Sequence, residues 1–215
     1  MENEVKKRAI IIAGSIDAID ENIKSYIDEN CYVICADNGL SFAQKNGISV
    51  DLALGDFDSY NGTLNDDINI IKLPARKDDT DLHFAAEKVI EMGFKNAILA
   101  GVTGGRIDHT LAAFQTLYYL NNNGVNAHIS DYNTKVFIAD KILNLNAPDY
   151  PCYFSVFPFG NSTPFVSIKG SEYDVENKPL NFDFPIGVSN EFKSKSVEIK
   201  CKNGKILVMI CRKTN

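Results

Sequence analysis

The hydrophobic and polar positions of the first 130 residues follow two alternating patterns. Short apolar runs rich in β-branched residues are separated by stretches in which apolar residues recur every three or four positions. The runs predict strands at residues 9–13, 32–36, 52–54, 68–73, 97–100 and 127–130. Because strands that alternate with helices build parallel sheets, we expect an α/β fold here: an open, mostly parallel sheet with helices on both faces.

Three segments between these strands carry the helical period. Their apolar stripes consist of Ile19, Ile23, Tyr26 and Ile27 in the first, of Leu82, Ala86, Val89 and Ile90 in the second, and of Ile107, Leu111, Phe114 and Tyr118 in the third. A stripe of this kind indicates the face that a helix turns toward the core. The third helix is expected over residues 107–121, with Gly124 suited to end it.

Beyond about residue 134 the helical period disappears, and aromatic and β-branched runs alternate with turn residues. Strands are expected around residues 154–157 and 166–168. Two more alternating runs, residues 197–201 and 206–210, flank Asn203-Gly204, a dipeptide favoured in tight hairpin turns. This half of the chain therefore predicts an all-β sandwich.

The change of pattern near residues 131–145 indicates a domain boundary. We expect an α/β domain at residues 1–133 and a β-sandwich domain at residues 134–215. No low-complexity linker separates the halves, so they should pack firmly together. This organisation favours a site between domains or between subunits.

Charge and composition narrow the possible partners. The net charge is −6 and no basic tract is present, whereas nucleic-acid binding relies on clustered Lys and Arg, so we expect no nucleic-acid partner. No apolar run reaches the roughly 18–20 residues of a membrane span, and the run at 9–13 is too short for a signal-peptide core. The expected location is the cytoplasm, without membrane contact. The five cysteines form no C-x-x-C pair and are interpreted as small buried hydrophobes.

Aspartates follow two of the predicted strands directly. Asp37 comes after the run at 32–36 and Asp56 shortly after the run at 52–54, at the edge where open α/β sheets bind their ligands. Asp56 and Asp58 are two residues apart, so in an extended segment they point to the same side and can share a cation. Asp and Gly are also ordinary turn residues, so either motif alone has a purely structural alternative.

A third acidic group, Lys77-Asp-Asp-Thr-Asp81, stands directly before the second helix. Asp and Thr are preferred helix N-caps, and acidic side chains in a first turn are stabilised by the helix dipole. One cap needs only one such residue, however, and three aspartates within four positions repel each other. The excess favours a cation site, while Lys77 is either a phosphate contact or a solvated surface charge.

A glycine-rich turn, Gly101-Val-Thr-Gly-Gly-Arg-Ile-Asp-His109, follows the strand at 97–100 and opens the third helix. Its backbone N–H groups can form an anion cradle, and Arg106 can grip phosphate oxygens with two donors. The turn matches neither the Walker pattern nor the dinucleotide fingerprint. His109 is either a ligand contact or a structural hydrogen-bonding group.

Together these groups place carboxylates and a phosphate cradle at one edge of one sheet. Their like charges can coexist only with a hard cation between them. Magnesium fits, because it takes carboxylates, waters and phosphate oxygens and needs neither Cys nor His. The residues thus predict a Mg²⁺-dependent enzyme that acts on a nucleotide polyphosphate.

In this order the motifs resemble those of thiamine pyrophosphokinases. The matching segments are Ala36-Asp-Asn-Gly39, Gly55-Asp-Phe-Asp-Ser59, Lys77-Asp-Asp-Thr-Asp81, Gly101-Val-Thr-Gly-Gly-Arg-Ile-Asp-His109 and, in the β half, Gly187-Val-Ser-Asn-Glu-Phe192. The resemblance implies an N-terminal domain that binds ATP and Mg²⁺, and a homodimer with thiamine near the subunit interface. It further implies transfer of the β,γ-diphosphate of ATP to the thiamine hydroxyl, which yields thiamine diphosphate and AMP.

The resemblance also implies a division of roles. Metal binding and catalysis fall to Asp56, Asp58 and Asp81. The nucleotide and phosphate side falls to Asp37, Asn38, Lys77, Thr103, Gly104, Gly105, Arg106, Asp108 and His109. Thiamine contacts fall to Ser189 and Asn190, with Asp81 as a candidate to orient the thiamine hydroxyl or to accept its proton. The chain has no Trp, so an aromatic stack on thiamine, known from some members, would use another residue.

Two alternatives stay open from the sequence. Asp56-Phe-Asp-Ser59 superficially resembles the nucleophile and acid pair of aspartyl phosphatases, although that pair usually follows the first strand, and the glycine-rich turn would have no role. The other alternative is a nucleotide- or thiamine-sensing module without turnover, although binding alone does not require the full acidic set.

Overall fold

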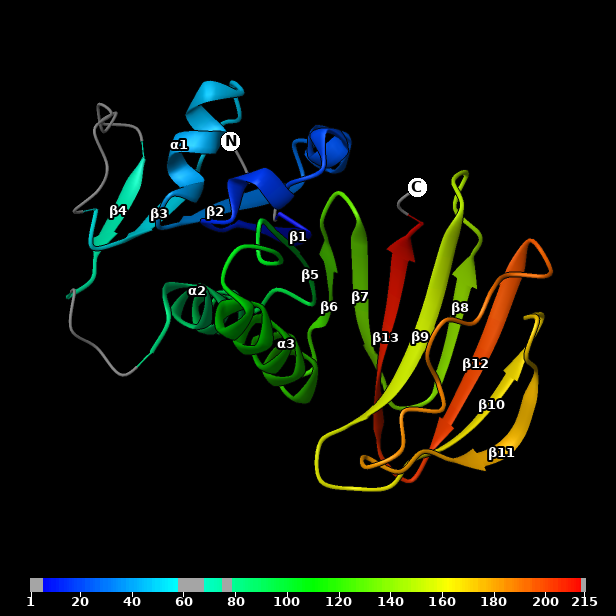
Figure 1. Ribbon diagram of the computed structural model, residues 1–215. Helices are drawn as coiled ribbons and strands as arrows, with labels where there is room; N and C mark the ends of the chain where they lie inside the picture. Colours follow the sequence, from blue (N-terminus) through cyan, green and yellow to red (C-terminus); the bar gives the residue numbers. More distant parts are fainter. Residues whose placement is uncertain (1–5, 58–67, 75–78, 214–215) are drawn as a thin grey trace. The chain divides into compact units, whose positions relative to one another are not determined.

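The computed structural model describes residues 6–57, 68–74 and 79–213. Figure 1 follows its helices and strands along the chain. The chain forms two compact units, Met1–Tyr132 and Asn133–Asn215.

The first unit is built around a parallel sheet. Its strands are β1 (Arg8–Ile12), β2 (Cys31–Ala36), β3 (Leu52–Gly55), β4 (Asn69–Lys72), β5 (Asn96–Ala100) and β6 (Asn126–Ser130). They lie in the order β4-β3-β2-β1-β5-β6, and every neighbouring pair within this set is parallel. The predicted strands and the predicted parallel sheet are confirmed.

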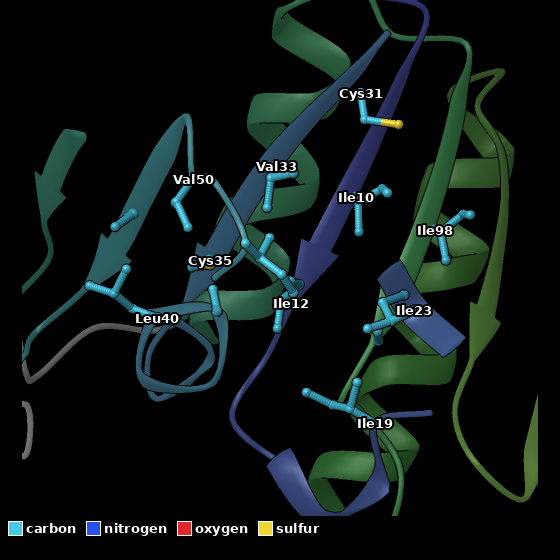
Figure 2. Packing of buried hydrophobic residues seen from close by; sticks show 14 residues of the cluster. Ile10, Ile12, Ile19, Ile23, Cys31, Val33, Cys35, Leu40, Val50 and Ile98 are labelled. Carbon is cyan, nitrogen blue, oxygen red and sulfur yellow. The ribbon is translucent and has the colours of Figure 1, made fainter. Parts of the chain in front are cut away.

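Helices cover both faces of this sheet, as predicted. The helical elements are η1 (Ile16–Ala18), η2 (Glu21–Tyr26), α1 (Gly39–Lys45), α2 (Asp81–Glu91) and α3 (Ile107–Asn122). On one face, Ile10 and Ile12 of the central strand pack with Leu40 of α1 and with Ile19 and Ile23 (Figure 2). On the other face lie α2 and α3 (Figure 1). Among the described residues, no helix is both long enough and apolar enough to cross a membrane.

The first helical segment differs from the prediction. Residues 16–26 form two short 3₁₀ helices, η1 and η2, instead of one α-helix. Ile19 and Ile23 are nevertheless buried in the core, as their spacing indicated. Ile19 lies between η1 and η2, and Ile23 lies within η2, so both side chains reach the core without a continuous α-helix.

The buried face of α3 also differs from the prediction. Ile107 and Leu111 of the expected stripe are 85% and 56% exposed. The buried side chains are instead Ala113, Leu117 and Leu120, together with Thr116. Small side chains let the helix approach the sheet closely, and they contribute little to an apolar pattern that large residues dominate. The prediction of this stripe was therefore wrong.

The second unit is a sandwich of two antiparallel sheets. Its strands are β7 (Thr134–Ala139), β8 (Ile142–Asn146), β9 (Cys152–Phe159), β10 (Phe165–Lys169), β11 (Val175–Pro179), β12 (Ser196–Lys202) and β13 (Lys205–Arg212). Strand β13 pairs with β7 and β9 in one sheet, and the other has the order β11-β10-β12-β8. Inward side chains of both sheets, among them Phe154, Val166 and Val208, share one core. The predicted all-β sandwich is confirmed.

The predicted hairpin at Asn203-Gly204 is wrong, although both of its strands exist. β12 pairs with β10 and β8, whereas β13 pairs with β7 and β9, so the chain crosses from one sheet to the other at this turn. Apolar residues of both strands point into the shared core from opposite sides. The same alternation arises in a hairpin and in this crossing, which is why the sequence pattern could not separate them.

Candidate active site

The central strands of the first unit create a crevice at their carboxyl ends. β1 and β5 are neighbours, and the strands that follow each of them lie on opposite sides of the pair. Loops diverge at such a switch point and leave space for a ligand. A cavity of about 280 Å³ lies here. Its lining consists of Ala13, Gly14, Ser15, Ala36, Asp37, Thr80, Asp81, Leu82, Gly101, Val102, Arg106, His109 and Ala112. Predicted residues from three motifs therefore share one cavity.

The first two motifs lie side by side at this edge. The backbone N–H of Asp37 donates to the carbonyl of Leu54 over 2.9 Å. Gly55 packs so closely that a Cβ there would lie 3.3 Å from the Asp37 Cα. Asp56, which follows Gly55, is half-buried, and Asn38 is exposed at the N-cap of α1. The predicted Asp58 lies outside the described residues.

The third motif opens α2, and Thr80 supplies its cap. The Thr80 hydroxyl accepts a hydrogen bond from the His83 N–H over 3.1 Å. The helix start therefore does not need an aspartate as its N-cap. Asp81, the first helical residue, lines the cavity beside Thr80. The predicted Lys77 lies outside the described residues.

The backbone N–H groups of the glycine-rich turn bind a carboxylate side chain of the same protein, that of Asp131. Asp131, directly after β6, is 2% exposed. Its carboxylate accepts hydrogen bonds from the N–H groups of Gly101 (2.6 Å), Val102 (3.1 Å) and Thr103 (2.8 Å), and from the Thr103 hydroxyl (2.7 Å). Burial raises the pKa of Asp131, while these hydrogen bonds act against that rise.

This arrangement corrects the prediction that Thr103 contributes to a phosphate cradle. The N–H and the hydroxyl of Thr103 are directed at Asp131. Phosphate contact stays a prediction for Gly104 and Gly105, whose φ angles of +85° and +58° suit glycine. The sequence offered a signal for Asp131 that the prediction missed, since this residue follows a strand at the same edge as Asp37.

Arg106 is oriented by a neighbour on its own turn. Its guanidinium donates to both carboxylate oxygens of Asp108, over 2.6 and 3.2 Å. The hydrogen bonds from Arg106 lower the pKa of Asp108 to about 2, so the pair stays charged near neutrality. Arg106 and His109 line the cavity, and a guanidinium has five N–H donors, so donors remain for a phosphate.

The fifth motif lies in the second unit, beside a cavity of about 500 Å³. Ser189 is exposed at a φ of +61°, and its N–H donates to the Ser155 hydroxyl over 3.1 Å. Asn190 is buried. Its amide oxygen accepts from the N–H groups of Tyr173 (3.1 Å) and Glu191 (2.9 Å). The amide nitrogen donates to the carbonyl of Tyr173 (3.0 Å) and to the hydroxyl of Ser171 (3.2 Å). The side-chain amide of Asn190 therefore fixes the backbone of Tyr173.

Exposed apolar side chains accompany this second cavity. Its lining includes Tyr173, Ile186, Gly187 and Val188, together with the charged residues Glu172, Asp174 and Lys178. Tyr173 is 68% exposed, and Ile186 and Val188, which also line the cavity, are 47% and 48% exposed. Large exposed apolar groups gathered in one region are typical of a binding surface.

Three motif residues have strained backbones. Asp37, Phe57 and Ser189 have φ angles of +51°, +57° and +61°, a region that non-glycine residues seldom occupy. Each of them stands within one of the motifs found in the sequence. Such strain clusters at functional sites, where the surrounding structure holds it in place.

The metal-binding group was predicted as Asp56, Asp58 and Asp81. Within residues 6–57, 68–74 and 79–213, no three His, Cys, Asp or Glu side chains come close enough together to hold a metal ion. Because Asp58 lies outside these ranges, the predicted trio stays a prediction.

The fold and this crevice define a class of protein: an α/β enzyme with carboxylates and an arginine at its switch point, followed by a β-sandwich. Comparison with known families narrows the class. Residues 23–129 match the thiamin pyrophosphokinase catalytic domain, and residues 141–206 match the thiamin pyrophosphokinase vitamin B1 binding domain. The chain belongs to the thiamine pyrophosphokinase family.

Relatives from a bacterium and a nematode align with almost the whole chain. It is 26% identical to thiamine pyrophosphokinase of Bacillus subtilis (strain 168) over 208 residues, which cover 93% of this chain and 96% of the relative. It is 24% identical to thiamin pyrophosphokinase 1 of Caenorhabditis elegans over 219 residues, or 96% and 90% of the two chains.

Solved structures share the fold. The crystal structure of the Bacillus subtilis thiamine pyrophosphokinase superposes with a TM-score of 0.86 at 22% identity, covering 97% of this chain and 100% of that one. The enzyme of Geobacillus thermodenitrificans gives a TM-score of 0.83 at 21% identity, covering 97% and 99%.

Proposed function

We propose that this protein transfers the β,γ-diphosphate of ATP to the hydroxyl of thiamine, which yields thiamine diphosphate and AMP. This is the known reaction of its family. The observation that carries the proposal is the cavity at the switch point, where Asp37, Asp81 and Arg106 from three motifs meet. In-line attack at a phosphorus depends on positioning and on neutralising charge, and this set of groups provides both.

Magnesium is proposed as the metal, held by Asp56, Asp58 and Asp81. Of these three, Asp81 lines the cavity, Asp56 is not among the lining residues, and Asp58 lies outside the described residues. The donor chemistry fits, because Mg²⁺ is bound through one or two carboxylates plus substrate phosphates rather than by a complete protein cage. When bound, the ion would neutralise charge on the phosphate oxygens. Arg106 would bind the same polyphosphate through the donors that Asp108 leaves available, and Asp81 would orient the thiamine hydroxyl.

The cavity of the second unit is proposed as the thiamine site. It is lined by Gly187, Val188 and Asn190 of the fifth motif, and by Tyr173. An aromatic ring can stack on the flat thiamine rings, and Tyr173 offers one in a chain without Trp. The exposed apolar groups around this cavity support a homodimer, in which the partner subunit would complete the site.

The phosphatase alternative gains no support from the strand order. Asp56 follows β3, whereas the nucleophile and acid pair of aspartyl phosphatases usually follows the first strand. A phosphatase also gives no role to the cavity-lining Arg106 and His109.

The reaction is tested directly by product analysis. We expect the purified protein, given ATP, thiamine and Mg²⁺, to form AMP and thiamine diphosphate in equal amounts, and to stop when EDTA removes the metal. Chromatography of both products measures this ratio. ADP together with thiamine monophosphate would refute diphosphate transfer, and binding without any product would favour the sensing module.

Substitution of Tyr173 tests the acceptor site. Tyr173→Ala removes the ring from the cavity, and we expect KM for thiamine to rise about tenfold, since an aromatic contact of this kind is worth about 1 kcal/mol beyond its buried area. Tyr173→Phe keeps the ring and serves as the matched control. Steady-state kinetics with varied thiamine measures both. An unchanged KM for thiamine in Tyr173→Ala would contradict the proposal that thiamine binds in this cavity.

A further inference from the structure

Asp131 stands apart from the sequence motifs, yet it contacts one of them at four points. Its carboxylate receives hydrogen bonds from three consecutive backbone N–H groups and one hydroxyl, all between 2.6 and 3.1 Å. The side chain is almost completely buried at the end of β6. A buried carboxylate this far from water persists only when such donors compensate it.

The turn that Asp131 holds is clamped from the other side as well. Gly101 has a φ of +70°, and a Cβ on it would lie 2.8 Å from the carbonyl oxygen of Ala13. The Gly101 carbonyl accepts a hydrogen bond from the N–H of Ser15 over 2.9 Å. Ser15 follows β1, and Asp131 follows β6. The turn after β5 is therefore fixed between the loops of two other strands.

The chemistry of the turn explains why a carboxylate is needed there. Successive backbone N–H groups that converge form an anion-binding nest. In this protein the nest at Gly101, Val102 and Thr103 already contains an anion, the Asp131 carboxylate. A phosphate group of a ligand cannot use the same N–H groups. It must bind further along the turn, toward Gly104 and Arg106.

We propose that Asp131 is a positioning residue for the nucleotide side of the site, which fixes the glycine-rich turn and sets where along it the polyphosphate of ATP binds. This inference rests on the proposed function for the identity of the ligand. Asp131 acts through the turn and does not touch the substrate. Its loss should therefore affect ATP more strongly than thiamine.

The experiment compares wild-type protein with Asp131→Asn. An Asn side chain keeps one acceptor oxygen but places an NH₂ group against N–H donors, so the turn should lose its fixed shape. We expect KM for ATP and the Kd for ATP from calorimetry to rise about tenfold or more, while KM for thiamine changes less than about twofold. Hydrogen exchange should speed up in the segment 101–106 and stay unchanged in β1 and β2.

Val50→Ala is the matched control for a general loss of stability. Val50 is buried in the core of the same unit, before the start of β3, at the sheet edge opposite the cavity. The Val50→Ala substitution should lower the melting temperature without raising KM for ATP. An equal rise of KM for ATP in both variants, or an unchanged KM and exchange rate in Asp131→Asn, would overturn the inference.

A second variant covers the case in which Asp131→Asn does not fold. Thr103→Val removes only the hydroxyl bond to Asp131. We expect a smaller rise in the Kd for ATP and faster exchange in the same segment, and the absence of both would count against the inference. If the wild-type protein binds ATP but forms no thiamine diphosphate, the proposed function fails, whereas the Kd comparison still decides the role of Asp131.

Discussion

Asp81→Asn is expected to reduce kcat/KM by a factor of about 10²–10³, the usual cost of losing one group that stabilises charge in a transition state. The carboxylate lines the switch-point cavity at the start of α2. The amide has nearly the same shape but carries no charge to hold a cation or to accept a proton. Measurement of thiamine diphosphate formation at varied ATP and thiamine gives the factor.

The fold should survive this substitution. Thr80 caps α2, so the helix keeps its N-cap, and the interaction of the Asp81 charge with the helix dipole is worth about 0.3–1 kcal/mol. Glu91→Gln is the control, because it neutralises a carboxylate at the opposite end of the same helix, where Glu91 is paired with Lys88. Asp81→Asn retaining near-normal activity would refute the metal-site and catalytic assignment. Loss of activity in both variants would point to a general effect of charge.

Gly39→Ala is expected to lower the free energy of unfolding by about 3 kcal/mol or more, at the upper end of the cost of overpacking. A Cβ on Gly39 would lie 2.1 Å from the carbonyl oxygen of Ile12 and 2.7 Å from its carbon. Both atoms belong to the backbone of β1, a central strand with a parallel neighbour on each side, so they cannot move aside. Alanine would otherwise favour the helix by about 1 kcal/mol, which the clash exceeds.

Urea denaturation followed by circular dichroism measures this loss. Gly14→Ala is the matched control, because a Cβ there would lie no closer than 3.5 Å to its nearest neighbour, an ordinary contact. Its stability should equal that of the wild type or exceed it slightly, since Ala restricts the unfolded chain. If Gly39→Ala proved as stable as Gly14→Ala, α1 would not pack on β1 as described.

Much of the fold could be predicted because its strands are buried on both faces. Such strands give continuous apolar runs, as in residues 9–13, and these are visible without any structure. Helix α1 was not predicted, since seven residues are too few for a periodic pattern. The turn at Asn203-Gly204 shows another limit. A local sequence specifies that the chain reverses, but partners far away in the sequence decide which sheet each strand joins.

The site was predicted in part for a similar reason. Asp37 and Asp81 could be placed at one edge because each follows or precedes an element with a clear pattern. Asp131 was missed although it follows a strand at this edge, because its partners are backbone N–H groups 28 to 30 residues away, and nothing in the sequence marks that pairing. Asn190 shows the converse: its motif indicates that the residue matters, but only the structure shows that its amide faces inward to Tyr173.

The strained residues Asp37, Phe57 and Ser189 set a limit on how far this protein can be made more heat-resistant. Each left-handed residue costs of order 1–3 kcal/mol, and glycine at the same position would recover part of it. Such exchanges would remove the Asp37 carboxylate or the Ser189 hydroxyl from the motifs. Two left-handed residues outside the motifs, Asn177 and Asn203, carry no such restriction, so heat resistance can be raised there, in the cores and in the surface loops.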